Sequence, residues 1–404
     1  MKGPSIRRAA VVLAMAASAA LSACVVQDQR PTERVVVEKA TTEIPQEQLL
    51  DVGIMLFDPN IPDDPEEREK QRIFPDVREA EARYMPVVLR DTLEGTGYWG
   101  QVRVLPRNVT SMDVYIRGTI IKSTGEELEF DLDVTDVTGR RWFSKTYKGK
   151  ADTRAYKDIP SRPIDPFEAL YHTVANDLIA ARRELSSAEL VQIRQVSDMR
   201  FAADLAPYAF GEYLQQDRDG RYSVVRLPAD GDPVAQSMQR VRERDYSLID
   251  TLNEHYSSFN STMSEPYTNW RKYSYEELEA ESEARRQAMT KQILGAVAVV
   301  GGIVAGSGAS SSAASAAATA AVIGGAYAFK SGFDQRAEVK MHSETVRQLG
   351  ESFQMEIQPM VVDVEGRTLQ LKGSAEEQYA EWRRLLKELY EHETGLPATV
   401  GPAT

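Results

Sequence analysis

The chain has 404 residues, of which 42% are hydrophobic and 27% are charged, and its formal net charge is −13. This length gives material for roughly two or three domains with substantial cores. The acidic balance argues against nucleic acid as a partner, because its phosphates would be repelled, and no basic patch with interleaved aromatic residues offsets it.

The first residues have the layout of a secretory signal peptide. Three basic residues, Lys2, Arg7 and Arg8, precede the apolar run "AAVVLAMAASAALSA", which is too short to span a membrane. The run ends in "LSAC", and these four residues resemble the lipobox of bacterial lipoproteins. The resemblance implies that residues 1–23 are removed as a signal peptide and that Cys24 carries a covalent lipid. We expect no other cofactor.

The cysteine count supports this reading. Cys24 is the only cysteine, so a disulfide within one chain is impossible, and a lone free thiol would be unusual in an oxidising periplasm. A cleaved secretory signal that leaves Cys24 free is the alternative. An Asp at position 25 would imply retention in the inner membrane. The residue there is Val25, which implies a lipid-anchored protein of the outer membrane that faces the periplasm.

The region after the signal divides into a tether and a small domain. Residues 24–48 are polar without a sustained period and predict a lipidated tether. In residues 49–155, an apolar run, a helical pattern closed by Gly95 and four strand patterns follow one another. Pro86 lies inside the helical pattern and predicts a kink or a late helix start. Phe130, Leu132 and Val134 show period-two alternation, and we expect the strand acids Asp131, Asp133 and Asp136 to face water.

The motifs of this region carry a second resemblance. They are "VGIMLFDP", "LEGTGYWGQVRVLP", "VYIRGTI" and "LDVTDVTGRRWFSKTYKG". Residues of about 50–152 resemble the small α/β domain of curli-secretion-channel-type lipoproteins. The amino-terminal domain of the Tol system's periplasmic protein and flagellar outer-membrane lipoproteins are similar too. The resemblance implies a non-catalytic periplasmic domain that makes ring or partner contacts. The Pro-rich loop, residues 58–70, departs from this pattern, because such domains usually connect more tightly here.

Residues 156–292 read as a helical region. Asp165 is expected to cap its first helix, with Pro166 at the first helical position. Further helices follow, separated by the loop "QQDRDGRYSVVRLPADGDP", in which one short strand fits. The last helix, "SYEELEAESEARRQAMTKQ", is strongly charged and leads directly into an uncharged stretch.

Residues 293–329 contain no charge and are rich in glycine and alanine. Two segments surround "GSGASSS", and neither matches an apolar spanning helix of about 20 residues. Small residues recur every four positions, a spacing that lets helix backbones approach closely. We expect a glycine-zipper membrane hairpin that packs on itself or on neighbouring chains, and a buried hairpin in a soluble domain is the alternative. The packing positions are Ala298, Gly302, Gly306, Ala316, Ala320, Gly324 and Ala328.

Residues 330–404 predict a helix–hairpin–helix module. "PMVVDVEGRTLQLKG" reads as a β-hairpin with "EG" at the turn. The last helix begins with Ser374 and Glu377 at the spacing of a capping box. The strand–turn–strand–helix order weakly resembles half of the periplasmic BON-type module. The fold class predicted for the whole chain is α+β.

No catalytic motif is present. The histidines have no metal-ligand spacing, and there is no nucleophile elbow, P-loop or dinucleotide fingerprint. We expect no metal site and a non-enzymatic outer-membrane lipoprotein that acts as a structural subunit of an envelope assembly, specifically an oligomeric export or secretion complex. Its expected partners are outer-membrane lipid and either further copies of itself or other envelope proteins. The alternative is a monomeric periplasmic lipoprotein that binds a partner and whose hairpin only anchors or packs.

Overall fold

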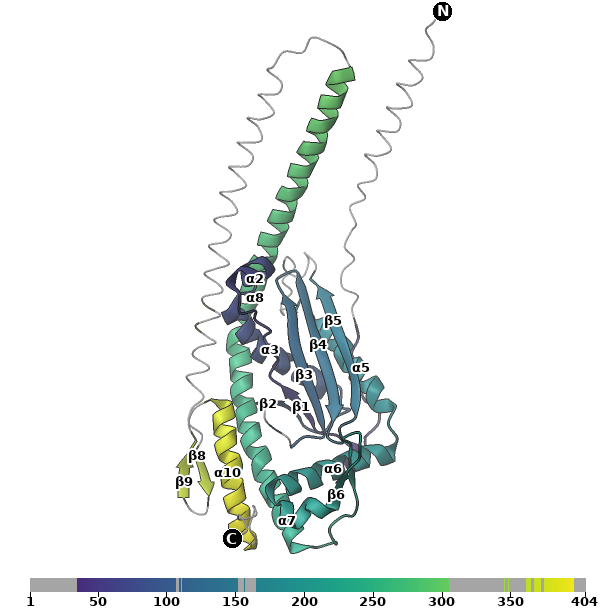
Figure 1. Cartoon of the computed structure of the whole chain (residues 1–404), viewed down its shortest axis with the longest axis vertical. Coiled ribbons are helices and arrows are strands. Elements are labelled where there is room, and N and C mark those ends of the chain that lie inside the picture. The colour runs from purple at the N-terminus through teal and green to yellow at the C-terminus, as the bar shows by residue number, and fades with distance from the viewer. Residues whose placement is uncertain are drawn as a thin grey trace, which may run out of the picture.

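The computed structural model describes residues 35–106, 109, 111–151, 156, 165–304, 345, 348, 361–364, 367–371 and 374–395. Figure 1 shows a body built on a twisted sheet, with one long helix extending beyond it. The strands are β1 Val52–Met55, β2 Val102–Leu105, β3 Val114–Ser123, β4 Glu127–Asp136, β5 Arg141–Lys150, β6 Leu214–Gln216, β7 Tyr222–Val224, β8 Val361–Val364 and β9 Arg367–Gln370. The helices are η1 Gln46–Gln48, α2 Pro65–Gln71, α3 Pro75–Glu94, α5 Glu168–Arg183, α6 Ser187–Leu205, α7 Pro207–Phe210, η2 Gly211–Tyr213, α8 Pro233–Val304 and α10 Ala375–Thr394.

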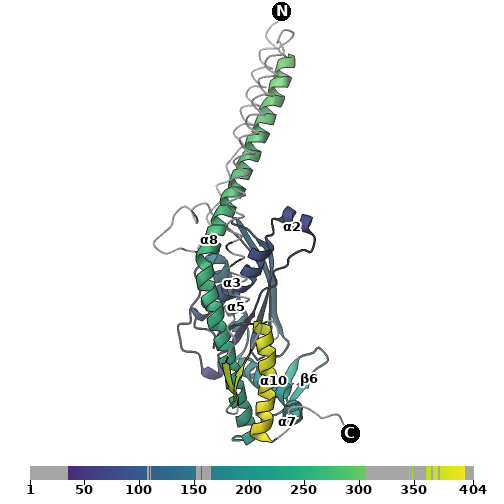
Figure 2. The ribbon, with the colours of Figure 1, turned by 90° about the vertical axis from the view of Figure 1, so that its left-hand side faces the viewer.

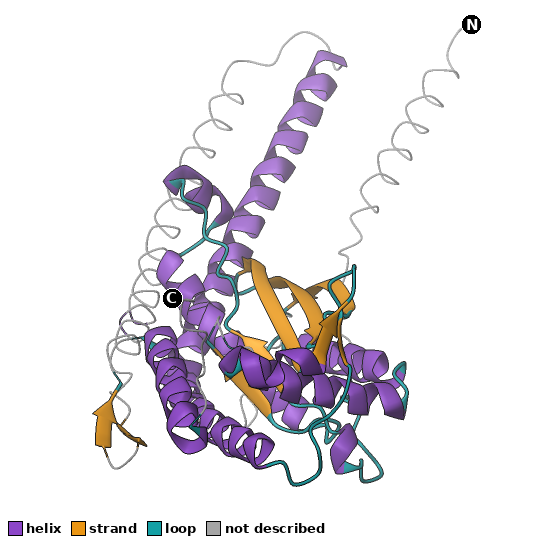
Figure 3. Ribbon diagram, turned by 60° about the horizontal axis from the view of Figure 1, so that its bottom comes forward, coloured by secondary structure: helices purple, strands orange, loops and turns teal. Residues whose placement is uncertain are grey.

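The five-stranded sheet has the order β2-β1-β3-β4-β5. β1 is parallel to both β2 and β3, and β3, β4 and β5 are antiparallel. Helix α3 connects β1 to β2, and Figure 3 shows helices gathered on one side of the sheet. The α+β class is confirmed, as is the predicted order of one strand, a helix and four further strands.

The alternation predicted for β4 is confirmed with one exception. Phe130, Leu132 and Val134 are fully buried, whereas Asp131 is half-exposed. Asp136 was expected to face water but is buried, because its carboxylate organises the β4–β5 turn. It accepts hydrogen bonds from the Thr138 backbone N–H at 2.9 Å and the Trp142 indole N–H at 2.9 Å, and from the Thr138 hydroxyl.

Helix α3 passes through Pro86 and begins at Pro75, so the late start is wrong. A proline inside a helix leaves the carbonyl four residues earlier without its helical donor. The Phe57 backbone N–H, just after β1, donates to this carbonyl of Ala82 at 3.0 Å. The proline therefore provides a hydrogen bond between the helix and the end of the central strand.

The outer edge of β2 is closed by a side chain of α8. Asn253 Oδ1 accepts from the Val104 N–H at 2.7 Å, and Asn253 Nδ2 donates to the Val104 carbonyl at 3.0 Å. Beside it, Arg103 pairs with Asp250 at 2.6 Å. An unpaired strand edge is a template for aggregation, and here an amide takes the place of a neighbouring strand.

Residues 35–48, predicted as part of the tether, are bound to the body. The Val35 carbonyl lies 2.7 Å from His172 Nδ1, and the Glu38 N–H donates to Asn176 Oδ1 at 2.9 Å. The Ala40 N–H donates to the Thr96 carbonyl at 2.8 Å. Residues 24–34 of the predicted tether lie outside the described residues.

The helical region differs from the prediction at two points. Helix α5 begins at Glu168, and the carboxylate of Asp165 accepts from the Phe167 N–H at 2.8 Å, so neither Asp165 nor Pro166 has the expected position. Asp165 instead bonds an arginine of α8. The loop after α7 contains two short strands, β6 and β7, which form an antiparallel hairpin.

The carboxyl-terminal hairpin and helix are present as predicted. Ser374 accepts from the Glu377 N–H at 3.2 Å, and Glu377 accepts from the Ser374 N–H at 2.8 Å, which confirms the capping box. Tyr379, Trp382 and Leu386 are buried against the body, and Figure 2 shows α10 alongside the lower part of α8.

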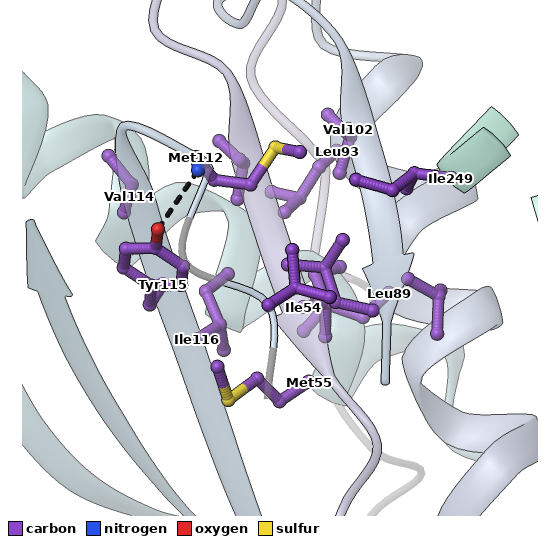
Figure 4. Close-up of a cluster of buried hydrophobic side chains, with 14 of the residues drawn as sticks. Ile54, Met55, Leu89, Leu93, Val102, Met112, Val114, Tyr115, Ile116 and Ile249 are labelled. Atoms are coloured by element: carbon purple, nitrogen blue, oxygen red, sulfur yellow. Dashed lines mark hydrogen bonds between the residues drawn. The ribbon is translucent and has the colours of Figure 1, made fainter. Parts of the chain in front are cut away.

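One hydrophobic core joins the α/β region, the helical region and α10. Figure 4 shows its centre, where Ile54 of β1, Leu89 of α3 and Ile249 of α8 lie together. The Met112 N–H donates to the Tyr115 hydroxyl at 2.9 Å beside them. The described parts of the three predicted regions therefore share one core.

Candidate functional site

Helix α8 is the feature on which the functional reading depends. Its 72 residues correspond to about 108 Å at 1.5 Å per residue. Its first part lies along the body and its last part projects past the sheet (Figures 1 and 2). The sequence predicted separate helices and a new region from residue 293, but the helix continues from Pro233 to Val304 without a break.

A cluster of buried side chains on one face of α8 explains why the helix continues through Pro266. Phe259, Met263, Tyr267 and Trp270 are buried together and pack against α3. Their spacing of three and four residues places them on one face of a helix. Burial of such side chains contributes roughly 1.5–3 kcal/mol each, which offsets the roughly 3 kcal/mol that an internal proline costs.

A buried arginine fixes α8 near the point where it leaves the body. Arg271 donates two hydrogen bonds to the carboxylate of Asp165, at 3.1 and 3.0 Å. Its guanidinium lies 4.2 Å from the ring centroid of Tyr267, and its side chain is 2% exposed. The bidentate contact ties α8 to the segment that leads into α5.

A buried glutamate of α3 forms a second attachment next to it. Glu81 accepts hydrogen bonds from the Ser123 hydroxyl of β3 and from the Tyr267 hydroxyl of α8, the latter at 2.7 Å. Arg78 lies 3.4 Å from its other oxygen. Burial raises the pKa of Glu81 above its ordinary value, although Arg78 and the two hydroxyls oppose the shift. One carboxyl group thus links α3, β3 and α8.

The turn between β3 and β4 touches the backbone of α8. A Cβ on Gly125 would lie 2.0 Å from the Arg271 carbonyl oxygen and 2.4 Å from the Tyr275 nitrogen, so only glycine fits there. The Gly125 N–H donates to the Ser274 hydroxyl at 3.3 Å, and its carbonyl accepts from the Tyr156 hydroxyl at 2.6 Å. The sheet and α8 are in backbone contact at this end.

The described chain begins at the same end of the body. Val35 contacts His172 in the second turn of α5, and Glu38 pairs with Arg183 at the end of that helix, at 2.6 Å. Residues 35–38 therefore run along α5 in the direction of the helix. Asp165, just before α5, pairs with Arg271 of α8, so the start of α5 lies beside the point where α8 leaves the body. The chain at Val35 therefore meets the body at the end where α8 leaves it.

Helix α10 is held to α8 and α6 by buried polar groups. The Tyr379 hydroxyl donates to Asp245 Oδ2 at 3.3 Å. The guanidinium groups of Arg242 and Arg383 lie 5.6 and 5.0 Å from the centroid of the Phe201 ring. Burial raises the pKa of Asp245, and Arg383 opposes the shift. The carboxyl-terminal helix is thereby fixed to the first part of α8.

The structure places only two of the predicted site residues. Ala298 and Gly302 lie in the last turns of α8. Within the part of the chain that the structure describes, none of the helices is both long and apolar enough to cross a membrane. Across those same described residues, no three or more His, Cys, Asp or Glu side chains form a group that could hold a metal ion. Outside the described residues lie Cys24, Gly306, Ala316, Ala320, Gly324 and Ala328.

The residues that anchor α8 were not predicted from the sequence. Glu81 lies four residues after Val77 and three before Tyr84, on the buried face of α3, and Arg271 stands among aromatic residues in "YTNWRKY". A charge at a core position of a helical pattern indicates a buried partner, which is the signal that could have identified them.

Comparison with protein families, with curated proteins and with solved structures finds no match for this chain.

Proposed function

We propose that this protein is a lipoprotein of the outer membrane, anchored through Cys24 and facing the periplasm, and that it is a non-enzymatic structural subunit of an oligomeric envelope assembly. An export or secretion complex is the assembly that the predicted resemblance favours. Glycine-zipper hairpins that carry Ala298, Gly302, Gly306, Ala316, Ala320, Gly324 and Ala328 would associate the copies.

One observation carries the proposal: the chain meets the body at the end where α8 leaves it. Cys24 lies eleven residues before Val35, so a lipid on Cys24 sits within about 38 Å of the body. The glycine- and alanine-rich stretch begins at Ile293, eighteen residues after Tyr275, or about 27 Å along a helix. The lipid and the stretch can therefore reach the same membrane.

The composition of the stretch supports association over simple anchoring. Its small residues recur every four positions, so two helix backbones can approach closely where lipid removes the hydrophobic drive. A body fixed at the base of α8 by Arg271, Glu81 and Gly125 would give each copy a defined orientation around such a contact.

The test is the mass of the mature protein, purified from outer membranes in mild detergent and measured by light scattering. We expect a discrete oligomer, and we expect Gly302→Leu combined with Gly324→Leu to reduce its mass. The control pairs Val300→Leu with Val322→Leu, which adds leucine away from the small-residue positions. A monomer in the parent protein would reject the assembly and favour the partner-binding alternative.

The anchor is tested separately with Cys24→Ser. We expect the variant to lose incorporated fatty acid and to keep its signal peptide uncleaved at residue 23. A Cys24→Ser protein that still incorporates labelled fatty acid would show that the lipoprotein reading is wrong.

A further inference from the structure

A cavity of ≈ 480 Å³ lies between α2, the β3–β4 turn and α8. Two other polar cavities of the described chain measure ≈ 200 and ≈ 190 Å³. Only the first falls in the range of about 300–1,000 Å³ that small-molecule sites occupy. It is at the end of the body where α8 leaves, as the position of α2 beside α8 in Figure 1 indicates.

The Pro-rich loop, residues 58–70, and the two residues after it supply one wall of this cavity. The first part of the loop is fixed to the sheet, because the Asp58 N–H donates to the Gly118 carbonyl at 2.8 Å and Asn60 Nδ2 donates to the Ile120 carbonyl at 3.1 Å. Just after the loop, Arg72 pairs with Glu281 of α8. The loop that departs from the predicted domain pattern thus connects the sheet to α8 at one wall of the cavity.

The lining is cationic within an acidic protein. Four cations line the cavity: Lys70, Arg72, Arg78 and Lys122. Two acids also line it, which leaves a formal charge of +2 (4 − 2) where the whole chain carries −13. Both acids have lysine partners outside the lining: Glu126 lies 3.6 Å from Lys150 and Glu129 lies 2.9 Å from Lys148. Three of the cations have acid partners outside the lining in turn, since Arg72 pairs with Glu281, Arg78 with Glu81 and Lys122 with Glu127. With all of these partners included, the formal charge is +1 (6 − 5).

Arg78 gives the cavity a buried positive charge. Its side chain is 4% exposed, and its three contacts are long: 3.3 Å to the Pro59 carbonyl, 3.3 Å to the Ile120 carbonyl and 3.4 Å to Glu81. Ile121 and Leu278 add an apolar side to the cavity.

We propose that this cavity binds the phosphate group of a small anionic molecule through Arg78, Lys70 and Lys122. Guanidinium and ammonium groups converging on one cavity suit phosphate, and the apolar side suits an attached glycerol or acyl group. The phosphate can come from an anionic lipid headgroup or from a free phosphate ester. The lipid source rests on the proposed function, which places this end of the body toward the membrane, whereas the phosphate chemistry does not.

The test titrates the full-length protein in mild detergent with three probes: inorganic phosphate, glycerol 3-phosphate and a short-chain phosphatidylglycerol, with short-chain phosphatidylcholine as the zwitterionic reference. We expect saturable binding of at least one anionic probe. Lys70→Gln combined with Lys122→Gln should weaken it about tenfold or more, because charge-assisted hydrogen bonds are lost. Lys145→Gln, on β5 with its partner Asp177 and outside the lining, is the matched control.

The outcomes separate the sources. Preference for phosphatidylglycerol supports a lipid headgroup, and equal binding of glycerol 3-phosphate supports a free ester. Binding of no anionic probe overturns the proposal, as does a loss of binding that is equally large in Lys145→Gln. The result is independent of the oligomer test, because a monomer that binds phosphate would reject the assembly and keep this site.

Discussion

The two parts of α8 are held in different ways. Residues 233–275 bury side chains on every turn that meets the body, from Met238 through Tyr256 to Trp270 and Tyr275. After Tyr275, none of the described side chains of α8 is buried; Leu278 lines the cavity and Glu281 pairs with Arg72. The sequence changes at the same point, from aromatic residues to a run rich in Glu, Ala and Arg. Packing therefore stabilises the first part, and helix propensity carries the second.

The largest effect is expected where the first part is attached most deeply. Arg271→Ala removes a buried charge from its carboxylate partner Asp165 and from the face of Tyr267. Loss of one partner of a buried pair costs about 3–5 kcal/mol. We expect the urea midpoint to fall accordingly. Lys272→Ala, at the next and less buried position, should change stability by less than about 0.5 kcal/mol. Equal losses in both variants would contradict a specific attachment.

The next effect concerns the sheet edge that α8 closes. Asn253→Ala leaves the Val104 N–H and carbonyl without the amide that now pairs with both. At about 1 kcal/mol for each hydrogen bond, with a further penalty for buried groups, we expect a loss of roughly 2–3 kcal/mol in chemical denaturation. Asn260→Ala, which removes a single 3.3 Å bond to the Tyr84 carbonyl, is the control and should cost less. A loss no larger than that of the control would show that the edge does not depend on Asn253.

A pH dependence is expected at the junction of α8 with the start of β3. Burial raises the pKa of Asp113 from 3.8 to about 6, against the opposing charges of Arg242 of α8 and Arg194 of α6, while Asp51 adds to the rise. The folded state holds this proton more tightly than the unfolded state. The stability it contributes is therefore present below about pH 4 and is lost as the pH rises through about 6, by roughly 3 kcal/mol.

Asp113→Asn should remove this part of the pH dependence. We expect the variant to gain stability relative to the parent protein between about pH 4 and pH 7, measured as the urea midpoint at each pH. Asp131→Asn, on the half-exposed face of β4, is the matched control for replacing an aspartate by asparagine. A slope that is the same in the parent protein and in Asp113→Asn would mean that another group titrates in this range.

Much of the fold followed from local patterns, and the remainder depended on contacts between distant residues. Strands β1 to β5 and the capping box at Ser374 were predictable because period-two alternation and cap spacing are local properties. The continuity of α8 was not, because a proline and polar residues around Pro266 look like a break until Met263 and Tyr267 are placed against α3. Asp165 was predicted as a helix cap because its partner Arg271, 106 residues away, cannot be found from local sequence.

The candidate site divides in the same way. Cys24 and the small-residue positions were found from local sequence and remain predictions. A charge within an apolar pattern could have indicated that Arg271 and Glu81 have buried partners, but the partners themselves depend on the tertiary structure, because Asp165 and Tyr267 are 106 and 186 residues away. That Val35 contacts the body at the same end from which α8 projects could also be learned only from the topology.

The smallest effect is expected in the second part of α8. Glu281 and Arg72 form a pair whose side chains are 32% and 37% exposed, and such pairs contribute about 0–1 kcal/mol. Glu281→Gln should therefore lower the stability of the body very little. The matched change in the first part is Asp250→Asn, whose partner Arg103 is only 6% exposed and lies 4.5 Å from the Tyr246 ring centroid. We expect that change to cost more, about 1–3 kcal/mol, because Arg103 loses its anionic partner while buried. If Glu281→Gln destabilises the protein as much as Asp250→Asn does, the second part of α8 is held by the body after all, and the contrast between the two parts fails.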